Sequence, residues 1–281
     1  MADKKCHLCY FKTGGNAYIS VVKCLHYIIY INKVFMSALT SQGRQRKYER
    51  KVWLHNMKRS EINAIMKDAL RLFDDYKISL PPFAKWAPEE WKQKGEETQE
   101  IKDNMLGWDI TDYGQGDFDK VGLLLITLRN GSQANPEKYA KPYAEKLMLV
   151  REQQLAPMHF HWYKMEDIIN RGGGNLMLQL YNSTADEQLA DTEVTVSIDG
   201  VQKTFPAGAI VRLTPGESIT LPKGLYHSFW GEEGKGTVIV QEVSMTNDDN
   251  TDNRFYEEVG RFPEIEEDEA PLHLLCNEYD K

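Results

Sequence analysis

The sequence lacks an excess of basic residues. Its 281 residues carry 34 Lys and Arg against 42 Asp and Glu, so the formal net charge is −8 at pH 7. Nucleic-acid backbones attract basic surfaces, and this charge balance therefore argues against a nucleic-acid partner. The acidic run EIEEDE, which begins at Glu264, is interpreted as a solvated face of the protein.

Cysteine is scarce as well. Three of the four cysteines, Cys6, Cys9 and Cys24, lie within the first 24 residues, and the fourth is Cys276. This distribution does not resemble a disulfide framework, so a reducing compartment, the cytoplasm, is expected. The stretch CHLC has half the ligand spacing of a zinc knuckle, but no second CxxC completes it, and a structural zinc site is not expected there.

The sequence also lacks a long uninterrupted apolar run. Its most apolar N-terminal stretch, residues 17–36, is broken by Lys23, His26 and Lys33, whereas a membrane-spanning helix needs about 20 nearly uninterrupted apolar residues. The stretch also has no small-residue cleavage site of the kind that ends a signal peptide. No membrane partner is expected, and residues 1–56 are interpreted as an extension that precedes a functional domain at residues 57–281.

Helical periodicity begins at Ser60, which is the expected N-cap of the helix. Apolar residues then fall on one face at 3.6-residue spacing: Ile62, Ile65, Met66, Ala69, Leu72, Phe73 and Tyr76. The helix must end before Pro81 and Pro82, because proline cannot continue it. A second short helix is expected near Pro88.

Beyond Trp108 the pattern changes to short apolar segments separated by Gly, Pro, Asn and Asp. These segments are GLLLITLRNGS, EKLMLVREQQ, NLMLQLYNS, EVTVSIDG, QKTFPAG, IVRLTPGESITLPKG and GTVIVQEVS. The first is expected to end in a turn at Asn130 and Gly131. Many short strands at regular spacing indicate a barrel or a sandwich. The predicted fold class is mainly β, an antiparallel barrel with the N-terminal helices packed outside it.

Four side chains form a candidate metal site. His159 and His161 are separated by one residue, so in a strand both imidazoles point to the same face and can reach one divalent cation. Glu166 follows five residues after His161, and His227 follows a Pro–Gly turn further along the chain. Three nitrogens and one carboxylate oxygen leave one or two coordination positions for water or substrate. A hydrogen-bonded core histidine or a single general acid–base histidine is the alternative, but neither explains a pair on one face.

These residues resemble the two motifs of the cupin superfamily. The first motif, G-x5-H-x-H-x3,4-E-x6-G, is similar to HFHWYKMEDIINRGG, and the second, G-x5-P-x-G-x2-H-x3-N, is similar to GESITLPKGLYHSFWG. The matching positions are His159, His161, Glu166, Gly173, Gly216, Pro222, Gly224 and His227. Gln153 and Gly231 replace the opening Gly of the first motif and the closing Asn of the second. Neither is a ligand position.

Most of residues 57–281 resemble the D-lyxose isomerase family of cupin sugar isomerases. The stretches that carry this resemblance are MKRSEIN, LPPFAKW, LGWDIT, TLRNG, HFHWYKMEDIINRGGGNL, NDDNTDNRF, GRFPEIEEDEAP and LLCNEY. The resemblance implies metal-dependent interconversion of D-lyxose and D-xylulose, with D-mannose and D-fructose as further substrates. It also implies a homodimer and a divalent metal, Mn²⁺ in first place and Co²⁺ or Zn²⁺ as alternatives. It does not extend to residues 1–56.

Three residues are candidates for proton transfer between the carbons of an aldose. Glu242 lies in the apolar segment VIVQEVS, where an unpaired carboxylate is unfavourable, and it is the candidate general base. Lys164 lies between the metal histidines and Glu166, and Lys146 alternates with apolar residues along one strand face. Burial beside a cation would lower a lysine pKa and suit it to proton transfer. The alternative for each is a solvated charge on the outer surface.

Asp249, Asp252 and Arg254, in the stretch NDDNTDNRF, are candidates for binding sugar hydroxyls, because carboxylates and guanidinium groups bind polyols through paired hydrogen bonds. A solvated Asx-rich loop is the alternative. The glycines at 172–174 are assigned a turn role, since no phosphate-binding G-x-x-x-x-G-K-[ST] accompanies them. Both proton transfer and a metal-assisted hydride shift are compatible with these residues.

Two other functions are compatible with the same metal ligands. A cupin dioxygenase would combine them with iron or copper and an apolar pocket for an aromatic substrate. A non-catalytic sugar-binding cupin would use the metal only to hold the barrel together. The Lys, Asp, Glu and Arg expected around the cavity favour a polyhydroxylated substrate instead.

Overall fold

The structure, a computed structural model, describes residues 56–279. The predicted extension at residues 1–56 lies outside the described residues except for its last position. Cys6, Cys9 and Cys24 lie outside them too, and Cys276 is a free, buried thiol. Among the described helices, none has the length and apolar character needed to cross a membrane.

The principal helix, α2 (Arg59–Asp75), begins one residue before the predicted cap. Its N-cap is Lys58, whose main-chain N–H donates to Glu61 Oε2 at 3.0 Å. The predicted cap, Ser60, lies instead in the first turn, where its hydroxyl donates to Asp268 Oδ2 at 2.7 Å. The predicted capping role of Ser60 is therefore wrong, because a carboxylate remote in sequence binds its hydroxyl.

Four shorter helices come after Pro81, where the first helix was predicted to have ended. They are η1 (Pro82–Lys85), α3 (Pro88–Trp91), η2 (Glu96–Thr98) and α4 (Gln99–Asp103). The helix predicted near Pro88 is confirmed, with the proline in the first turn, where its missing N–H leaves no partner unsatisfied.

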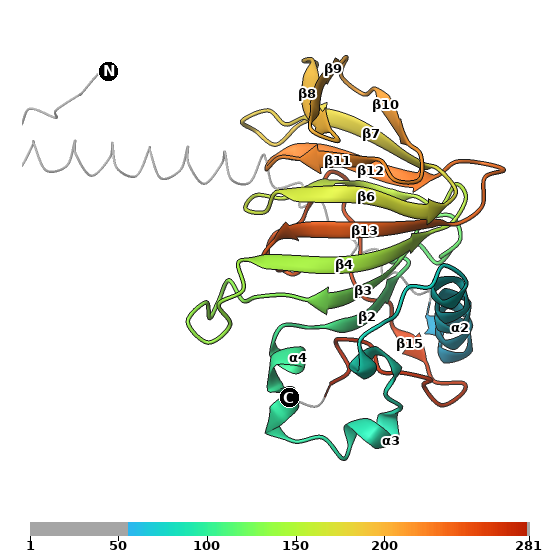
Figure 1. The fold of residues 1–281 in the computed structure, drawn as a ribbon. Helices are drawn as coiled ribbons and strands as arrows, with labels where there is room; N and C mark the ends of the chain where they lie inside the picture. Colours follow the sequence, from blue (N-terminus) through green and yellow to red (C-terminus); the bar gives the residue numbers. More distant parts are fainter. Residues whose placement is uncertain (1–55, 280–281) are drawn as a thin grey trace, which may run out of the picture. The chain divides into compact units, whose positions relative to one another are not determined.

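Two antiparallel sheets form the body of the domain (Figure 1). The larger sheet has the order β2 (Gly107–Thr111), β3 (Leu123–Arg129), β4 (Tyr143–Val150), β13 (Val238–Met245), β6 (Glu166–Gly173), β11 (Ser218–Leu221), β8 (Val194–Ile198), β9 (Val201–Phe205). The smaller has the order β10 (Ile210–Leu213), β7 (Leu176–Asn182), β12 (Leu225–Gly231), β5 (Ala156–Phe160), β14 (Arg254–Phe255). A short parallel pair joins β1 (Met57–Lys58) to β15 (Ile265–Glu266). The predicted mainly β class is confirmed.

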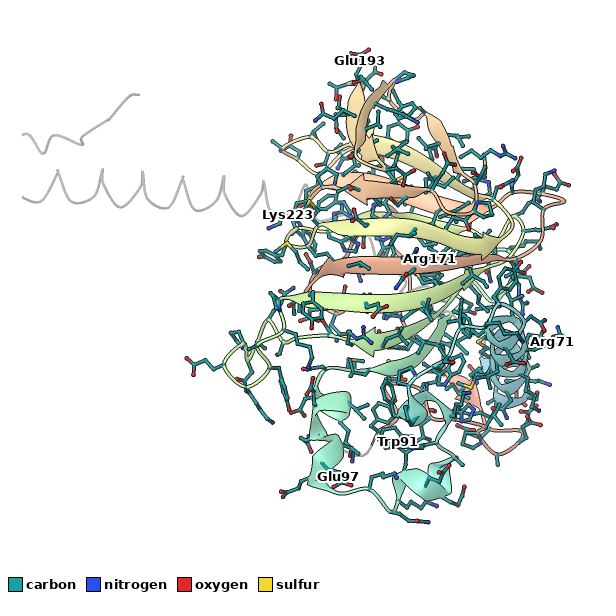
Figure 2. All side chains as sticks on the ribbon, in the orientation of Figure 1. Arg71, Trp91, Glu97, Arg171, Glu193 and Lys223 are labelled. Atoms are coloured by element: carbon teal, nitrogen blue, oxygen red, sulfur yellow. The ribbon has the colours of Figure 1, made fainter. Side chains whose placement is uncertain are left out.

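Apolar side chains fill both faces of the larger sheet. The inner face packs against the smaller sheet through residues such as Leu125, Ile168 and Phe229. The outer face packs against α2, whose Ile62 and Met66 are fully buried, while Arg71 projects from the exposed side of the helix (Figure 2). This two-layer burial confirms the prediction that the N-terminal helix packs outside the sheets.

One end of the inner face is polar, and this end positions the site. Along β4 the buried inward residues change from Met148 to Lys146, and along β13 they change from Val240 to Glu242. Lys146 pairs in register with Glu242 on one side and with Thr127 of β3 on the other. Strand alternation therefore directs these polar side chains into the same end of the barrel.

The predicted tight turn at Asn130 and Gly131 is wrong. A long connection, residues 130–142, joins β3 to β4, and Gly131 does not have a positive φ. The side chain of Asn130 is instead buried, donating to Asn247 O at 2.9 Å and accepting from Asn247 N at 3.0 Å. The Asn–Gly pair is typical of a hairpin turn, but here Asn130 instead binds the loop that contains Asn247.

The predicted turn glycines, 172–174, lie where β6 ends and β7 begins. Gly173 has φ +80°, and a Cβ at this position would lie 2.0 Å from Thr237 O. The main chain of the neighbouring strand therefore leaves no room for a side chain, in addition to the unfavourable backbone conformation.

Replacement of Gly173 by Ala is expected to destabilise the protein more than replacement of Gly200, which has the same φ of +80° but no atom within 4 Å of a Cβ. Gly200→Ala should lower the free energy of unfolding by about 1–2 kcal/mol, the cost of the left-handed conformation. Gly173→Ala should lower it by roughly 1–3 kcal/mol more, because the main chain must move. If chemical denaturation gave the same loss in free energy of unfolding for Gly173→Ala and Gly200→Ala, the steric argument would be wrong.

Candidate metal centre

Three histidines converge inside the polar end of the barrel. His159 lies on β5, His161 directly follows that strand, and His227 lies on β12 opposite His159 in the strand register. One nitrogen from each ring lies within 4.8 Å of the other two. Imidazole nitrogens at this spacing can all bind one divalent cation.

Glu166, at the start of β6, completes this group. Its Oε1 lies 3.4 Å from His161 Nε2 and 3.1 Å from His227 Nε2. Burial by itself would raise the pKa of Glu166, but the charge of Lys164 and the contacts with His161 outweigh burial and hold the pKa well below its usual range. The side chain is therefore an ionised carboxylate, and the structure brings together the four predicted ligands.

Main-chain carbonyl groups orient all three rings. The Nδ1 atoms of His159, His161 and His227 lie 2.8, 2.7 and 3.0 Å from the carbonyl oxygens of Pro157, Asp252 and Leu225, respectively. A carbonyl oxygen only accepts, so each Nδ1 carries a proton and each Nε2 is directed into the site.

The His159 ring is kept neutral by its surroundings. Burial lowers the pKa of His159 well below its usual value, and the neighbouring His227 and His161 act in the same direction. Metal binding requires a neutral imidazole. A site of three imidazoles and one carboxylate suits Mn²⁺, Fe²⁺, Co²⁺ or Zn²⁺ better than a purely oxygen-bound ion such as Ca²⁺.

A second group of charges lies against Glu166. Lys164 Nζ lies 2.8 Å from Glu166 Oε2 and 2.6 Å from Glu242 Oε1. Burial would lower the pKa of Lys164, but the charges of Glu166, Glu242 and Asp249 outweigh burial and raise it. The surrounding carboxylates thus stabilise the ammonium form of Lys164, and this side chain is protonated.

The charge contacts continue away from the histidines. Lys146 Nζ lies 3.7 Å from Glu242 Oε2 and 3.3 Å from both carboxylate oxygens of Asp249. Asp249 Oδ2 in turn lies 3.7 Å from Arg261 Nη2, and both terminal nitrogens of Arg261 donate to the carboxylate of Asp109. The pKa of Asp249 is lowered, because Lys146, Arg261 and Lys164 outweigh the effect of burial.

The prediction did not include Arg261 or Asp109. The only sequence signal for Arg261 is a single basic residue at the start of the acidic stretch GRFPEIEEDEAP. Asp109 alternates with the buried Trp108 and Ile110 on β2, as Lys146 does with its apolar neighbours on β4. That alternation is the signal that could have found it.

Two predicted sugar-binding residues are placed elsewhere. Asp252 is fully buried, and its carboxylate accepts the main-chain N–H groups of Tyr163 at 2.8 Å and Lys164 at 3.0 Å. Arg254 Nε donates to Glu187 Oε2 at 2.7 Å. Neither lines the cavity described next, whereas Asp249 does.

A small cavity lies between His161 and the lysine group. Its volume is about 50 Å³, and its lining includes His161, Lys164, Glu166, Glu242, Lys146, Asp249 and Arg261. Phe255 covers it on one side, with its ring 5.3 Å from the ring of His159 and 5.7 Å from that of Tyr113. A cavity lined by buried charged side chains beside a potential metal site is a favourable place for chemistry at a polar substrate.

Comparison with known families agrees with this arrangement. The family model described as "D-lyxose isomerase" matches residues 57–279. The chain belongs to the D-lyxose isomerase family. The predicted enzyme class, an aldose–ketose isomerase, is thereby confirmed.

Curated relatives in the D-lyxose isomerase family span the same region. A "D-lyxose/D-mannose isomerase" of Serratia proteamaculans is 53% identical over 224 residues, which is 79% of this chain and 98% of the relative. A protein of the same name from Escherichia coli O157:H7 is 52% identical over 224 residues, with the same coverage.

Solved structures share the fold at low sequence identity. An L-ribose isomerase of Acinetobacter sp. DL28 superposes with a TM-score of 0.52 at 14% identity, and it covers 75% of this chain and 99% of its own. The L-ribose isomerase of Geodermatophilus obscurus gives a TM-score of 0.51 at 15% identity, with the same coverage. The predicted cupin fold is confirmed.

Replacement of Asp252 is expected to weaken metal binding, although Asp252 is not a predicted metal ligand. Asp252→Ala removes the carboxylate that holds the main chain of the turn after His161. Loss of such support typically lowers metal affinity by about 10–100-fold. Metal titration should show this loss for Asp252→Ala and a smaller one for Asp252→Asn, which keeps one acceptor.

Asp199→Ala is the matched control. Asp199 also accepts a main-chain N–H, from Ser218 at 2.9 Å, but in the exposed turn between β8 and β9. Its replacement should leave metal affinity unchanged. Equal affinities for the Asp252→Ala and Asp199→Ala variants would show that Asp252 does not position the site.

Proposed function

We propose that the protein is a metal-dependent isomerase that interconverts D-lyxose and D-xylulose, and also D-mannose and D-fructose. The observation that carries this proposal is the convergence of three imidazole Nε2 atoms and the Glu166 carboxylate beside the Lys164–Glu242 pair. The names of the curated relatives support both aldoses. The described cavity is lined by charges that suit a polyhydroxylated molecule.

A divalent cation held by His159, His161, Glu166 and His227 would stabilise negative charge on the oxygens of the two reacting carbons. The protein must supply the proton transfer between those carbons. Interconversion moves one proton from C2 of the aldose to C1 and another between the two oxygens, through an enediolate.

Glu242 is the proposed general base. Lys164 and Ser244 both donate hydrogen bonds to its Oε1, at 2.6 and 2.9 Å. Its Oε2 lies 3.7 Å from Lys146 Nζ, which is beyond hydrogen-bond distance. This second oxygen is therefore available to remove a proton from C2 and return it to C1.

The two lysines have complementary proposed roles. Lys164 is protonated and can donate a hydrogen bond to the substrate oxygen as negative charge develops there. Lys146 holds Glu242 and Asp249 in place by charge, because its ammonium group lies between them.

Among the predicted sugar-binding residues, Asp249 is the proposed hydroxyl partner, since it reaches the cavity. For Asp252 and Arg254 we propose supporting roles through the turn after His161 and through Glu187. Arg261, which faces the same cavity, is added as a second hydroxyl partner.

The other elements of the proposal rest on the family and on composition. We propose Mn²⁺ as the metal, a homodimer as the assembly and the cytoplasm as the location. Residues 57–281 are the proposed isomerase domain, which agrees with the extent of the family match. No nucleic-acid or membrane partner forms part of this proposal.

The proposal is preferred to a cupin dioxygenase because the cavity next to the histidines is charged. It is preferred to a non-catalytic sugar-binding cupin because Glu242 lines that cavity and its Oε2 lies beyond hydrogen-bond distance of Lys146 Nζ. Each alternative has a distinct experimental outcome.

Removal of the metal is expected to abolish conversion of D-lyxose to D-xylulose. The enzyme should be stripped with EDTA and assayed under argon after Mn²⁺, Co²⁺, Zn²⁺ or Mg²⁺ is added back singly, with Mn²⁺ expected to restore the most activity. Undiminished turnover after complete chelation would refute the metal-dependent function. A requirement for oxygen would favour the dioxygenase.

Replacement of Glu242 by Gln is expected to lower kcat by about 10²–10⁴-fold, the usual contribution of a general base. The amide preserves shape but cannot accept a proton at neutral pH. Metal content and sugar affinity should be retained, because Glu242 is not among the ligands. Glu233→Gln, at an exposed acid, is the control, and similar kcat values for both variants would exclude Glu242 as the base.

A further inference from the structure

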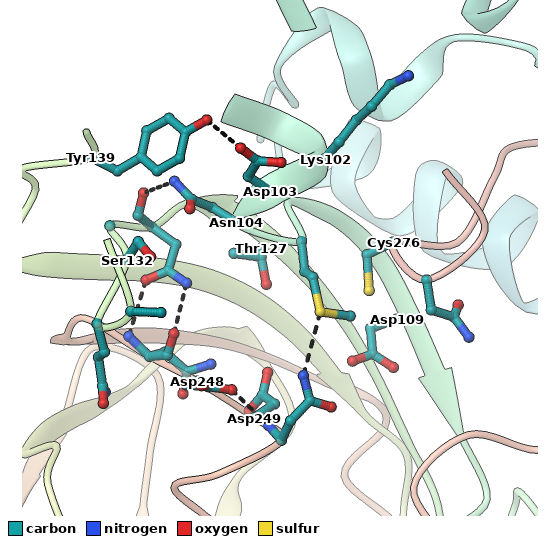
Figure 3. Close-up of a pocket in the computed structure, with 18 of the residues that line it drawn as sticks. Lys102, Asp103, Asn104, Asp109, Thr127, Ser132, Tyr139, Asp248, Asp249 and Cys276 are labelled. Carbon is teal, nitrogen blue, oxygen red and sulfur yellow. Dashed lines mark hydrogen bonds between the residues drawn. The ribbon is translucent and has the colours of Figure 1, made fainter. Parts of the chain in front are cut away.

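A second, much larger cavity lies beside the metal cavity (Figure 3). Its volume is about 610 Å³, against about 50 Å³ for the cavity that contains His161 and Glu166. It lies between α4, the 130–142 connection, the loop after β13 and the C-terminal segment. Figure 3 shows Asp109, Thr127 and Asp249 among the residues that line this cavity.

The two cavities share part of their lining. Asp249 and Arg261 contact both cavities, so this ion pair forms the boundary between them. Thr127 lines the larger cavity, and its register partner on β4, Lys146, lines the smaller one. A molecule that passes the ion pair would therefore touch residues of both cavities.

The metal cavity is too small for a whole sugar. One water needs roughly 10–15 Å³ of such volume, so the metal cavity has room for about four waters. A five-carbon sugar contains many more non-hydrogen atoms. Small-molecule sites usually measure about 300–1,000 Å³, and the larger cavity falls within that range.

Uncharged polar groups contribute much of the larger cavity's lining. They are Asn104, Thr127, Asn130, Ser132, Gln133, Asn135, Asn247, Asn250 and Asn277. Hydroxyl groups of a sugar both donate and accept hydrogen bonds, as this lining does. A polyol therefore fits the chemistry of this lining better than an apolar ligand does.

Two polar atoms in this lining have no hydrogen-bond partner within residues 56–279. The Oδ1 atoms of Asn104 and Asn247 are buried without a hydrogen-bond partner among residues 56–279, and each residue is more than nine-tenths buried. Thr127 also lines this cavity, and its side chain is only 5% exposed. Buried polar groups are rarely left unpaired, and such sites commonly bind a ligand or water.

We propose that the larger cavity is the second half of the sugar site, and that it binds the hydroxyl groups remote from the reacting carbons. The inference rests on the proposed function, and it adds a physical basis for discrimination between five-carbon and six-carbon sugars. C1 and C2 lie at the histidines, the middle of the sugar lies beside Asp249 and Arg261, and the far end enters the larger cavity. Thr127 and Asn104 are then specificity residues for the six-carbon substrate.

D-Lyxose and D-mannose test this arrangement directly, because they share their configuration at C2, C3 and C4 and differ by one hydroxymethylene unit at the far end. Thr127→Val removes a hydroxyl with little change of shape. It should lower kcat/KM for D-mannose by about tenfold, the effect of one lost hydrogen bond. It should change kcat/KM for D-lyxose by less than about twofold.

Thr195→Val is the matched control, since Thr195 is an exposed strand residue on β8, and neither sugar should be affected. Thr127→Ser keeps the hydroxyl and should keep the wild-type ratio of the two kcat/KM values. Equal losses for both sugars in Thr127→Val, or no loss for either, would overturn the inference. Failure of the unmodified enzyme to convert either sugar with any cation would instead refute the proposed function.

A second measurement needs no variant. The alditols obtained by reducing the two sugars do not react, so their inhibition constants report binding alone. If the larger cavity binds the far hydroxyl groups, the six-carbon alditol should inhibit the metal-loaded enzyme several-fold more tightly. Equal inhibition constants would overturn the inference.

Discussion

The site depends on the stabilisation of one buried carboxylate, that of Glu166. A charged group without a partner is strongly disfavoured in a protein interior. Here one oxygen faces the Nε2 atoms of His161 and His227, and the other lies 2.8 Å from Lys164. Glu166 thereby links the potential metal ligands to the residues proposed for proton transfer.

This arrangement also accounts for the remaining charges. From Glu166 the contacts run through Lys164, Glu242, Lys146, Asp249 and Arg261 to Asp109. Counted by formal charge, the series has four carboxylates against three cations, which leaves one negative charge in excess. A divalent cation at the histidines would more than compensate that excess, which fits the proposed metal dependence.

The residues with a strong local pattern were predictable from the sequence. His159, His161, Glu166 and His227 follow a spacing in which strand alternation brings nitrogen and oxygen donors to one face. Lys146 and Glu242 could be found because a charged residue in an apolar strand must have a partner. In these cases a short stretch of sequence contains the physical reason for the position of the side chain.

Residues in loops were less predictable, because their positions depend on contacts between distant segments. Asp252 and Arg254 have the same polar character as Asp249, yet only Asp249 reaches the metal cavity. Asn130 resembles a hairpin residue but bonds to Asn247. Ser60 resembles a cap but bonds to Asp268. Composition alone does not contain this information.

The carbonyl groups that orient the three imidazoles have unequal origins. His159 and His227 each rely on a carbonyl two residues earlier in their own strand, so the orientation of these rings is set locally. His161 relies on the carbonyl of Asp252, 91 residues away in sequence. The orientation of His159 and His227 would therefore be kept if only their own strands were grafted onto another barrel. The orientation of His161 would be lost unless the segment that contains Asp252 were grafted as well.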